Sequence, residues 1–303
     1  MKTKSDITNK LKKNVINLPS SFDINKIFDC GQCFRFDKVE NSDHEKEFSG
    51  VAFGRFVSFA QDNDILTVYN ADHDDYKNIW EHFLGLDVNY NDIEENILSI
   101  SNNPSLHSAV SFGRGIRILS QEPWEAICSF IISQNNNIPR IKKIIEALSR
   151  ECGDAVELPE GYEKHLSGIS SLCSFPTPEA ILKLGVDGLF DLKTGFRAKY
   201  IYDAAEKAVA GELDYEFIRS LPTPQAIDEL CKVKGIGPKV ASCALLFGFE
   251  KYDAFPVDVW IKKVISKYFL TDPLHFDASD LGEYAGIAQQ YLFYYERYGG
   301  YKE

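Results

Sequence analysis

Residues 221–263 are LPTPQAIDELCKVKGIGPKVASCALLFGFEKYDAFPVDVWIKK, and this segment is the most informative part of the chain. Thr223 and Pro224 suit the N-cap and the first position of one helix, and Pro238 suits the start of a second helix. Between the two helices, the glycines of residues 234–237 predict a tight hairpin. We expect the free backbone amides of this hairpin, and of the turn after it, to point outward. Together they form a small anion site that suits a phosphate of a nucleic-acid backbone.

Lys239 lies in the first turn of the second helix, directly after the hairpin. The positive end of the helix dipole and apolar neighbours such as Val240, Ala244 and Leu245 both disfavour an ammonium group at this position. A lysine in such surroundings is partly neutral near physiological pH and can attack an electrophilic carbon. The sequence therefore predicts that Lys239 is a nucleophile. The alternative is that Lys239 is an ordinary first-turn lysine exposed to solvent.

Asp258 is the expected partner of Lys239. It follows nineteen residues later, after Phe255, Pro256 and Val257, where another helix is expected to begin. An aspartate at this position can assist an amine by its charge or by proton transfer. The alternative is that Asp258 only caps the following helix.

Together these features resemble the helix-hairpin-helix motif of base-excision DNA glycosylases, in which a Gly-x-Gly hairpin, a lysine and a later aspartate occur in this order. Within that superfamily the chain is most similar to the 8-oxoguanine DNA glycosylases. The resemblance spans most of the chain, in the family's order. It includes GQCFR at residues 31–35, NNN at 135–137 with Arg140, GFR at 195–197, VDV at 257–259, and GIAQ at 286–289 continuing to Phe293.

The resemblance implies a reaction in which Lys239 attacks the deoxyribose C1′, the damaged base leaves, and an imine forms that can undergo β-elimination. Asp258 would assist the lysine and stabilise positive charge on the sugar. The enzyme would be a bifunctional glycosylase and lyase that excises 8-oxoguanine from damaged double-stranded DNA during base-excision repair. Because the target base must leave the helical stack, the enzyme needs a pocket for it.

Three side chains are expected to line this pocket. Cys243 lies four residues after Lys239, on the same helix face, although it could equally be a core thiol. Gln289 and Phe293 are also four residues apart on an expected helix, so that an amide lies one turn from an aromatic ring. As isolated residues they would more often be a solvated glutamine and a core phenylalanine. The resemblance implies that Gln289 contacts the base edge while Phe293 and Cys243 sandwich its faces.

Gly31 lies in the segment Cys30-Gly-Gln-Cys33. Taken alone, this glycine predicts only a turn after a strand. The resemblance implies that the Gly31 carbonyl accepts the N7 proton that 8-oxoguanine carries and guanine lacks. The Cys-x-x-Cys spacing cannot supply a four-thiolate zinc site, and no redox βαβ unit surrounds it, so we interpret it as a strand-end turn.

Other segments are expected to contact DNA. The three asparagines before Ile138-Pro139 indicate a loop that enters a new helix, or else a polar connection between helices. By resemblance, Asn135 fills the gap left by the flipped base, and Arg140 and Arg197 contact the opposite cytosine. The chain departs from the family at Trp260, where eukaryotic relatives usually carry a histidine near a DNA phosphate. The expected DNA-binding residues are Asn135, Arg140, Arg197, Gly235, Gly237 and Trp260.

No cofactor is expected to be required. The resemblance implies that the backbone carbonyls of Cys231, Val233 and Ile236 hold a structural monovalent cation or calcium at the hairpin. No iron-sulfur cluster is expected, because no cysteine quartet follows Cys243.

Composition places further bounds on the chain. A formal net charge of -12 argues against a DNA partner if it is spread evenly. The charges are unevenly distributed, however, and basic residues gather near the proposed chemistry, which favours a local basic groove. The basic residues in question are Lys193, Arg197, Lys199, Lys232, Lys234, Lys239, Lys262 and Lys263.

The seven cysteines are expected to be reduced thiols. The sequence shows no apolar stretch of the kind found in a signal peptide, and no apolar run of membrane-spanning length. We expect an intracellular monomer that does not bind membranes, located in the cytoplasm or nucleoid of a bacterium or in a eukaryotic nucleus.

The expected fold class is α+β, with an N-terminal antiparallel β-sheet domain over residues 1–113. A two-lobed all-α glycosylase domain is expected over residues 114–303, with the active-site cleft between its lobes. Strand-like composition occurs at residues 33–36, 48–59 and 65–70. From about residue 74 onward the apolar spacing is helical.

Two other functions are compatible with the sequence. A glycosylase for alkylated purines or oxidised pyrimidines has the same fold, but the alkylpurine enzymes generally lack the lysine. The chain could also be a non-catalytic DNA-binding or scaffold protein that keeps the motif for phosphate contacts. Trapping of a covalent imine with borohydride separates these possibilities, because a protein that only binds DNA forms no imine.

Overall fold

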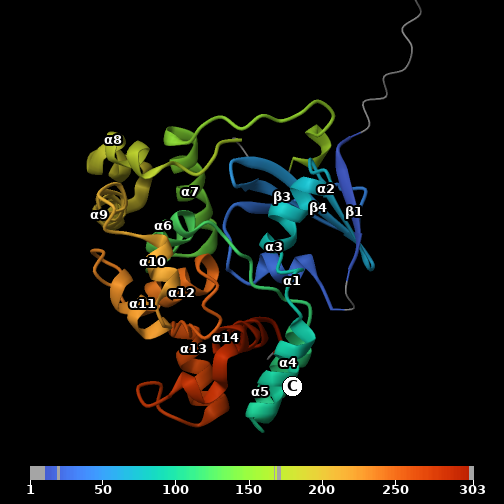
Figure 1. Ribbon diagram of the computed structural model, residues 1–303, viewed down its shortest axis with the longest axis vertical. Helices are drawn as coiled ribbons and strands as arrows, with labels where there is room; N and C mark the ends of the chain where they lie inside the picture. Colours follow the sequence, from blue (N-terminus) through green and yellow to red (C-terminus); the bar gives the residue numbers. More distant parts are fainter. Residues whose placement is uncertain (1–10, 19–20, 167, 169–171, 300–303) are drawn as a thin grey trace, which may run out of the picture.

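The computed structural model describes residues 11–18, 21–166, 168 and 172–299. It confirms the α+β class, since a five-stranded antiparallel sheet lies beside a larger helical body (Figure 1). The strand order in the sheet is β1-β5-β4-β3-β2. The strands are β1 (Lys13–Asn17), β2 (Phe36–Lys38), β3 (Lys46–Ala52), β4 (Arg55–Asp62) and β5 (Ile65–Tyr69).

The expected strand-like segment 48–59 is divided between β3 and β4. Phe53 and Gly54 have φ angles of 52° and 66°, and they form the two-residue turn of a hairpin in which Ala52 pairs with Arg55. Two consecutive positive φ angles give a turn whose twist matches the right-handed twist of the strands. A large aromatic residue is unusual at the first of these positions, and the sequence pattern therefore gave no sign of the turn.

Both faces of the sheet are covered. One face carries an aromatic cluster in which Phe28 of α1 stacks on Phe36 and Phe48 at centroid distances of 4.8 and 5.0 Å. The other face is covered by the connection between α7 and α8, from which Tyr162 packs on Phe56. This connection runs from the helical body across to the sheet (Figure 1).

Helices make up the rest of the fold. The 3₁₀ segments are Glu163–His165, Gly195–Arg197 and Ala278–Tyr284, and the π segments are Tyr76–Trp80, Phe190–Thr194, Ile265–Phe269 and Tyr295–Gly299. The α-helices are α1 (Ile24–Asp29), α2 (His73–Asp75), α3 (Glu81–Phe83), α4 (Tyr90–Ile100), α5 (Pro104–Gly113), α6 (Pro123–Ser133), α7 (Ile138–Cys152), α8 (Pro178–Leu189), α9 (Ala198–Val209), α10 (Tyr215–Ser220), α11 (Thr223–Leu230), α12 (Pro238–Gly248), α13 (Val259–Val264) and α14 (Ala285–Tyr294).

Helices α6 and α12 pack against each other in the centre of the helical body (Figure 1). Both are buried along nearly their whole length, and Phe130 stacks on Phe247 with a centroid distance of 5.3 Å. A helix buried on all sides shows little amphipathic pattern, which explains the apolar run of residues 240–248. Lys239 therefore projects from the first turn of a rigid central helix.

Helices α4 and α5 belong to the helical core, although they precede the expected boundary between residues 113 and 114. Their apolar residues, including Ile97 and Leu106, pack in the same cluster as α12 and α14. Helix α5 lies along α14, and Gly113 allows this approach because a Cβ atom there would lie 2.5 Å from the Tyr291 ring. The segment that follows the sheet in sequence thus supports the helix that carries Gln289 and Phe293.

Candidate active site

The helix-hairpin-helix forms as expected from residues 221–263. Helix α11 ends at Leu230, and α12 begins at Pro238 with Gly237 as its N-cap. Gly235 has a φ angle of 82°, and a Cβ atom at this position would lie 2.2 Å from the Tyr200 ring of α9. Only glycine satisfies both constraints. The hairpin is therefore held against α9 by close packing.

Two details of the hairpin differ from expectation. Thr223 is not the N-cap of α11, because Pro222 occupies that position and the Thr223 hydroxyl donates to Asp253 Oδ1 at 2.6 Å. The hairpin amides are also not all free. The Lys234 amide donates to Asp203 Oδ2 at 2.8 Å, and the Ile236 amide donates to the Val233 carbonyl at 3.0 Å. A phosphate would have to bind the remaining amides of the hairpin and of the first turn.

One pocket collects the predicted catalytic and base-binding residues. It is formed by the loop after α1, by α6, by α12, by the segment before α13, and by α14. These elements are far apart in the sequence and meet only in the folded chain. The lining residues are Cys30, Gly31, Phe130, Lys239, Cys243, Phe247, Pro256, Asp258, Gln289, Gln290 and Phe293.

Lys239 and Asp258 both line this pocket. The Lys239 ammonium lies 5.9 Å from the centroid of the Phe130 ring, near the limit for a cation–π contact. Asp258 is also the N-cap of α13, and its Oδ1 accepts hydrogen bonds from the amides of Trp260 and Ile261 at 2.9 and 2.8 Å. Asp258 therefore caps α13, and this role coexists with a position in the pocket, because one carboxylate oxygen makes both capping bonds.

The three expected base-binding side chains also lie in the pocket. Burial raises the pKa of the Cys243 thiol, while the charge of Lys239 and a hydrogen bond with it oppose that shift. Gln289 is buried, and its Oε1 atom has no hydrogen-bond partner among the described residues. An unpaired buried amide oxygen is costly unless a ligand completes it. Phe293 lies one turn further along α14, half-buried.

Gly31 faces Phe293 across the pocket. A Cβ atom on Gly31 would lie 3.9 Å from Phe293 Cε1, and the Gly31 φ angle is 78°. The expected strand-end turn is wrong in one respect, since Cys30 is the C-cap of helix α1 and the element directly before Gly31 is this helix. The left-handed glycine therefore ends a helix, which is the commonest use of such a residue.

The asparagine segment lies at the rim of the helical body. Asn137 caps α7 by accepting a hydrogen bond from the Arg140 amide at 3.0 Å, which confirms a loop that enters a new helix. Asn135 is exposed and has a left-handed φ angle of 47°.

The two arginines predicted to contact cytosine differ in their surroundings. Arg140 is exposed, and within the described ranges no hydrogen bond or ion pair of its side chain is recorded. Arg197 is 3% exposed, and its guanidinium donates to the carbonyls of Gln134, Asn135 and Thr194. Burial, and after it the charge of Arg140, lowers the pKa of Arg197. Arg197 therefore holds the Asn135 loop in place, whereas Arg140 has its donors available.

Exposed basic residues surround the hairpin and the start of α13. Lys263 Nζ lies 4.7 Å from the centroid of the Trp260 ring, which is 38% exposed. A cation therefore lies beside Trp260. Lys232 is paired with Glu229. Of the basic residues expected near the chemistry, five lysines are exposed and make no ion pair with another described residue: Lys193, Lys199, Lys234, Lys262 and Lys263.

Several pocket residues were not predicted from the sequence. Phe130 and Phe247 belong to apolar helix runs, in which nothing distinguishes a pocket residue from a core residue. Gln290 follows Gln289 and is 3% exposed. A polar residue inside the otherwise apolar stretch of residues 285–293 was the available signal.

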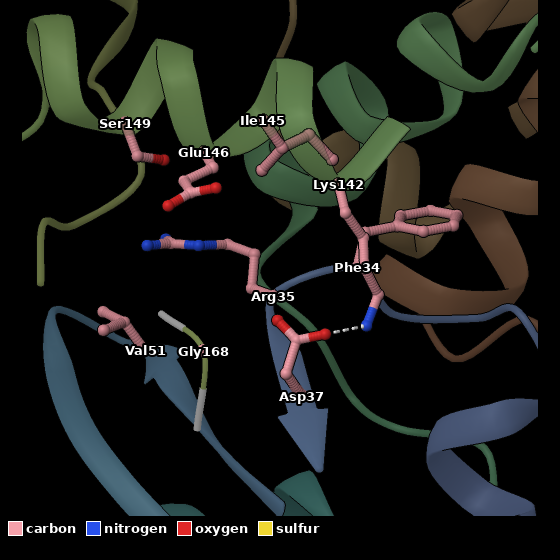
Figure 2. Close-up of a pocket in the computed structure, with 9 residues that line it drawn as sticks. All are labelled: Phe34, Arg35, Asp37, Val51, Lys142, Ile145, Glu146, Ser149 and Gly168. Carbon is pink, nitrogen blue, oxygen red and sulfur yellow. Dashed lines mark hydrogen bonds and ion pairs between the residues drawn. The ribbon is translucent and has the colours of Figure 1, made fainter. Parts of the chain in front are cut away.

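A second cavity with charged lining residues lies between β2 and α7 (Figure 2). Lys142 of α7 pairs with Asp37 of β2 at 2.6 Å, and Arg35 points toward Glu146 while donating to the Cys173 carbonyl. These contacts connect the sheet to the helical body. The cavity holds none of the predicted site residues, so the pocket around Lys239 is the candidate active site.

Comparison with known proteins gives matches to two family models and to several solved structures. Residues 15–127 match the N-terminal domain of 8-oxoguanine DNA glycosylase, and residues 128–278 match the HhH-GPD superfamily of base excision DNA repair proteins. One similar solved structure is that of MBOgg1 in complex with a low affinity DNA ligand. Its sequence is 38% identical to this chain and its TM-score is 0.85, and the match covers 95% of this chain and 96% of that chain.

Two further relatives carry similar names. The 8-oxoguanine glycosylase/lyase of Clostridium acetobutylicum is 36% identical in its apo-form, with a TM-score of 0.85, over 94% of this chain and 97% of that one. The same protein has also been solved with double-stranded DNA containing cytosine opposite 8-oxoguanine. An Arabidopsis thaliana N-glycosylase/DNA lyase is 32% identical over 200 residues, which are 59% of this chain and 52% of the relative. The chain spans about half the length of that curated protein.

Proposed function

Because this chain belongs to the 8-oxoguanine DNA glycosylase family, we propose that it excises 8-oxoguanine from duplex DNA and then cleaves the strand as a lyase. The observation that carries the proposal is the shared pocket of Lys239, Asp258, Gln289 and Phe293. It combines an amine, a carboxylate, a buried amide and an aromatic ring, which are the groups that covalent base excision requires. The relatives from Arabidopsis thaliana and Clostridium acetobutylicum are named as an N-glycosylase/DNA lyase and an 8-oxoguanine glycosylase/lyase.

The proposed chemistry begins with the flipped nucleotide in the pocket. The Lys239 amine forms a bond to C1′, the bond between C1′ and the base nitrogen breaks, and its electron pair leaves with the base, which takes up a proton. Loss of a proton from the lysine nitrogen and opening of the sugar ring give an imine. Removal of a C2′ proton then expels the 3′ phosphate. The Asp258 carboxylate stabilises positive charge on the sugar as the glycosidic bond lengthens.

Base recognition is proposed to use both walls of the pocket. Gln289, with its unpaired Oε1 atom, contacts the base edge, while Phe293 and Cys243 lie against the two faces of the base. The Gly31 carbonyl accepts the N7 proton of 8-oxoguanine. The test is a borohydride-trapping assay on duplexes that carry 8-oxoguanine, an alkylated purine or an oxidised pyrimidine. Preferential trapping on the first supports the proposal, and trapping on none contradicts it.

A structural cation at the hairpin is a separate proposal. The carbonyls of Cys231, Val233 and Ile236 would hold a monovalent cation or calcium, and the tight turn closed by the Val233 carbonyl keeps two of them close in sequence and space. Such an ion would hold the hairpin amides in position to bind a phosphate.

We also propose that the protein acts as a monomer on DNA inside the cell, because residues of a single chain form the whole pocket. Among the described residues, no helix is both long and apolar enough to cross a bilayer.

Binding to DNA should weaken steeply with salt. Although the net charge is -12, the exposed Lys262 and Lys263 lie on α13, directly after Asp258 and Trp260. Neutralising either lysine should lower affinity for damaged and undamaged duplexes alike, and should reduce the slope of log Kd against log salt by about 1. Lys164→Gln, remote on the sheet side and paired with Asp43, serves as the control. A Kd that stays constant from low to high salt would contradict the local groove.

A preference for cytosine opposite the lesion should depend mainly on Arg140. An unpaired cytosine offers acceptors to a guanidinium, whereas adenine offers an amino donor, and the mismatch costs about 1–3 kcal/mol. About tenfold faster single-turnover excision opposite cytosine than opposite adenine is therefore expected, and Arg140→Ala should remove most of this preference. Arg197→Ala should slow excision opposite all four bases, because it releases the Asn135 loop. An unchanged preference in Arg140→Ala would assign the contact to Arg197 instead.

A further inference from the structure

Gln290 lies in the pocket wall but on a different side of α14 from its neighbour Gln289. Its Nε2 atom donates to the carbonyl of Cys30 at 2.7 Å, across 260 residues of sequence. The side chain is 3% exposed, so water does not readily compete for this bond. The contact joins α14, which carries Gln289 and Phe293, to the loop that carries Gly31.

The Cys30 carbonyl belongs to the peptide group that enters Gly31. Because a peptide group is planar, holding its oxygen also holds the direction of the Gly31 amide. Gly31 needs this support more than other residues, since it lacks a side chain and has a φ angle of 78°. A hypothetical Cβ atom at Gly31 would have only ordinary contacts, the nearest at 3.7 Å, so packing alone does not immobilise the residue.

The peptide group that leaves Gln32 is held in the same way. Gln121 Nε2 donates to the Gln32 carbonyl at 2.8 Å. The Gln32 side chain, fully buried, donates to the carbonyls of Ile27 and Arg117 at 2.9 and 2.8 Å and accepts from the Leu119 amide at 2.8 Å. The Gly31 carbonyl belongs to the peptide group between Gly31 and Gln32. The carbonyls before and after it, those of Cys30 and Gln32, each accept a hydrogen bond from a buried glutamine side chain.

We infer that Gln290 is a positioning residue for lesion recognition: it fixes the Cys30–Gly31 peptide so that the Gly31 carbonyl faces the N7 position of the flipped base. The inference rests on the proposed function and adds a residue to it. Gln121 holds the loop from the side of the central helices, whereas Gln290 holds it from the helix that also carries Gln289 and Phe293. Gln290 thereby sets the distance between the two walls that contact the base.

The test separates recognition of the base from the chemistry of the sugar. Gln290→Met keeps the length of the side chain and removes the donor, and Gln290→Glu keeps its shape. Both variants should excise 8-oxoguanine about five- to tenfold more slowly, the fold-change that corresponds to the net contribution of one hydrogen bond. Cleavage of a duplex with a preformed abasic site should keep its wild-type rate, because that reaction needs Lys239 but no base in the pocket.

The matched control is Asn103→Asp. Asn103 Nδ2 donates to the Tyr268 carbonyl at 2.8 Å outside the pocket, and its Oδ1 caps α5, a role that aspartate retains. This variant should leave both rates unchanged. If both Gln290 variants excise 8-oxoguanine at the wild-type rate, or lose excision and abasic-site cleavage in equal proportion, the positioning role is overturned. A wild-type protein that does not release 8-oxoguanine would instead overturn the proposed function.

Discussion

Lys239→Gln is expected to reduce both base release and borohydride trapping below detection, while damaged duplex still binds. The lysine projects from the first turn of α12 into the pocket, beside Cys243 and the Phe130 ring. Glutamine keeps a polar side chain, one atom shorter than that of lysine, but it cannot form an imine. Because α12 is held by packing along its length, the fold should tolerate a change at its exposed end.

Single-turnover excision, trapping and equilibrium binding on the same 8-oxoguanine duplex measure this outcome. Lys234→Gln is the control, since it removes an exposed positive charge from the same hairpin without touching the pocket. It should weaken binding modestly and leave the rate from the bound state unchanged. Wild-type excision by Lys239→Gln would show that another nucleophile, such as an activated water, attacks C1′.

Asp258→Asn should slow base excision by about 10²–10⁴-fold, the range that is typical for loss of a positioned proton-transfer or electrostatic group. Its effect on folding should be small, because asparagine is as good an N-cap as aspartate and its Oδ1 atom can accept the same two bonds from the amides of Trp260 and Ile261. Asp258→Ala removes both functions. It should lose activity to a similar extent and also lower the free energy of unfolding by about 1 kcal/mol.

Comparison of the two variants separates charge from capping. Asp214→Asn provides the control, because Asp214 caps α10 by accepting from the Phe217 amide at 3.0 Å and lies outside the pocket. Excision rates and urea unfolding curves should both remain at wild-type values in this control. If Asp258→Asn excised the lesion at the wild-type rate while Asp258→Ala was destabilised, Asp258 would be a helix cap and nothing more.

Much of the candidate site was predictable because it depends on local spacing. Lys239 and Cys243 are four residues apart on one helix, as are Gln289 and Phe293, and α-helical geometry places each pair on one face. Asp258 was predictable as a helix cap, and it lines the same pocket as Lys239. The order of the motifs along the chain also indicated the family. These inferences required no knowledge of which distant segments meet.

The helix-hairpin-helix, the α+β class and the residues with the right chemistry for the pocket could be predicted from the sequence, because short-range steric and hydrogen-bonding preferences dominate at those positions. Which polar groups remain available depends instead on tertiary packing. Arg140 and Arg197 are the same residue type, yet one is exposed and the other is bound to three carbonyls.

The same applies to the hairpin amides and to Gln290. Asp203 takes the Lys234 amide, and Gln290 reaches a carbonyl 260 residues away. A donor that is buried, as Gln290 Nε2 is, must find an acceptor to offset the cost of leaving water, and the acceptor that it finds depends on the packing of the whole chain. Residue type therefore defines what a side chain can donate or accept, and the fold defines whether that capacity is left for DNA.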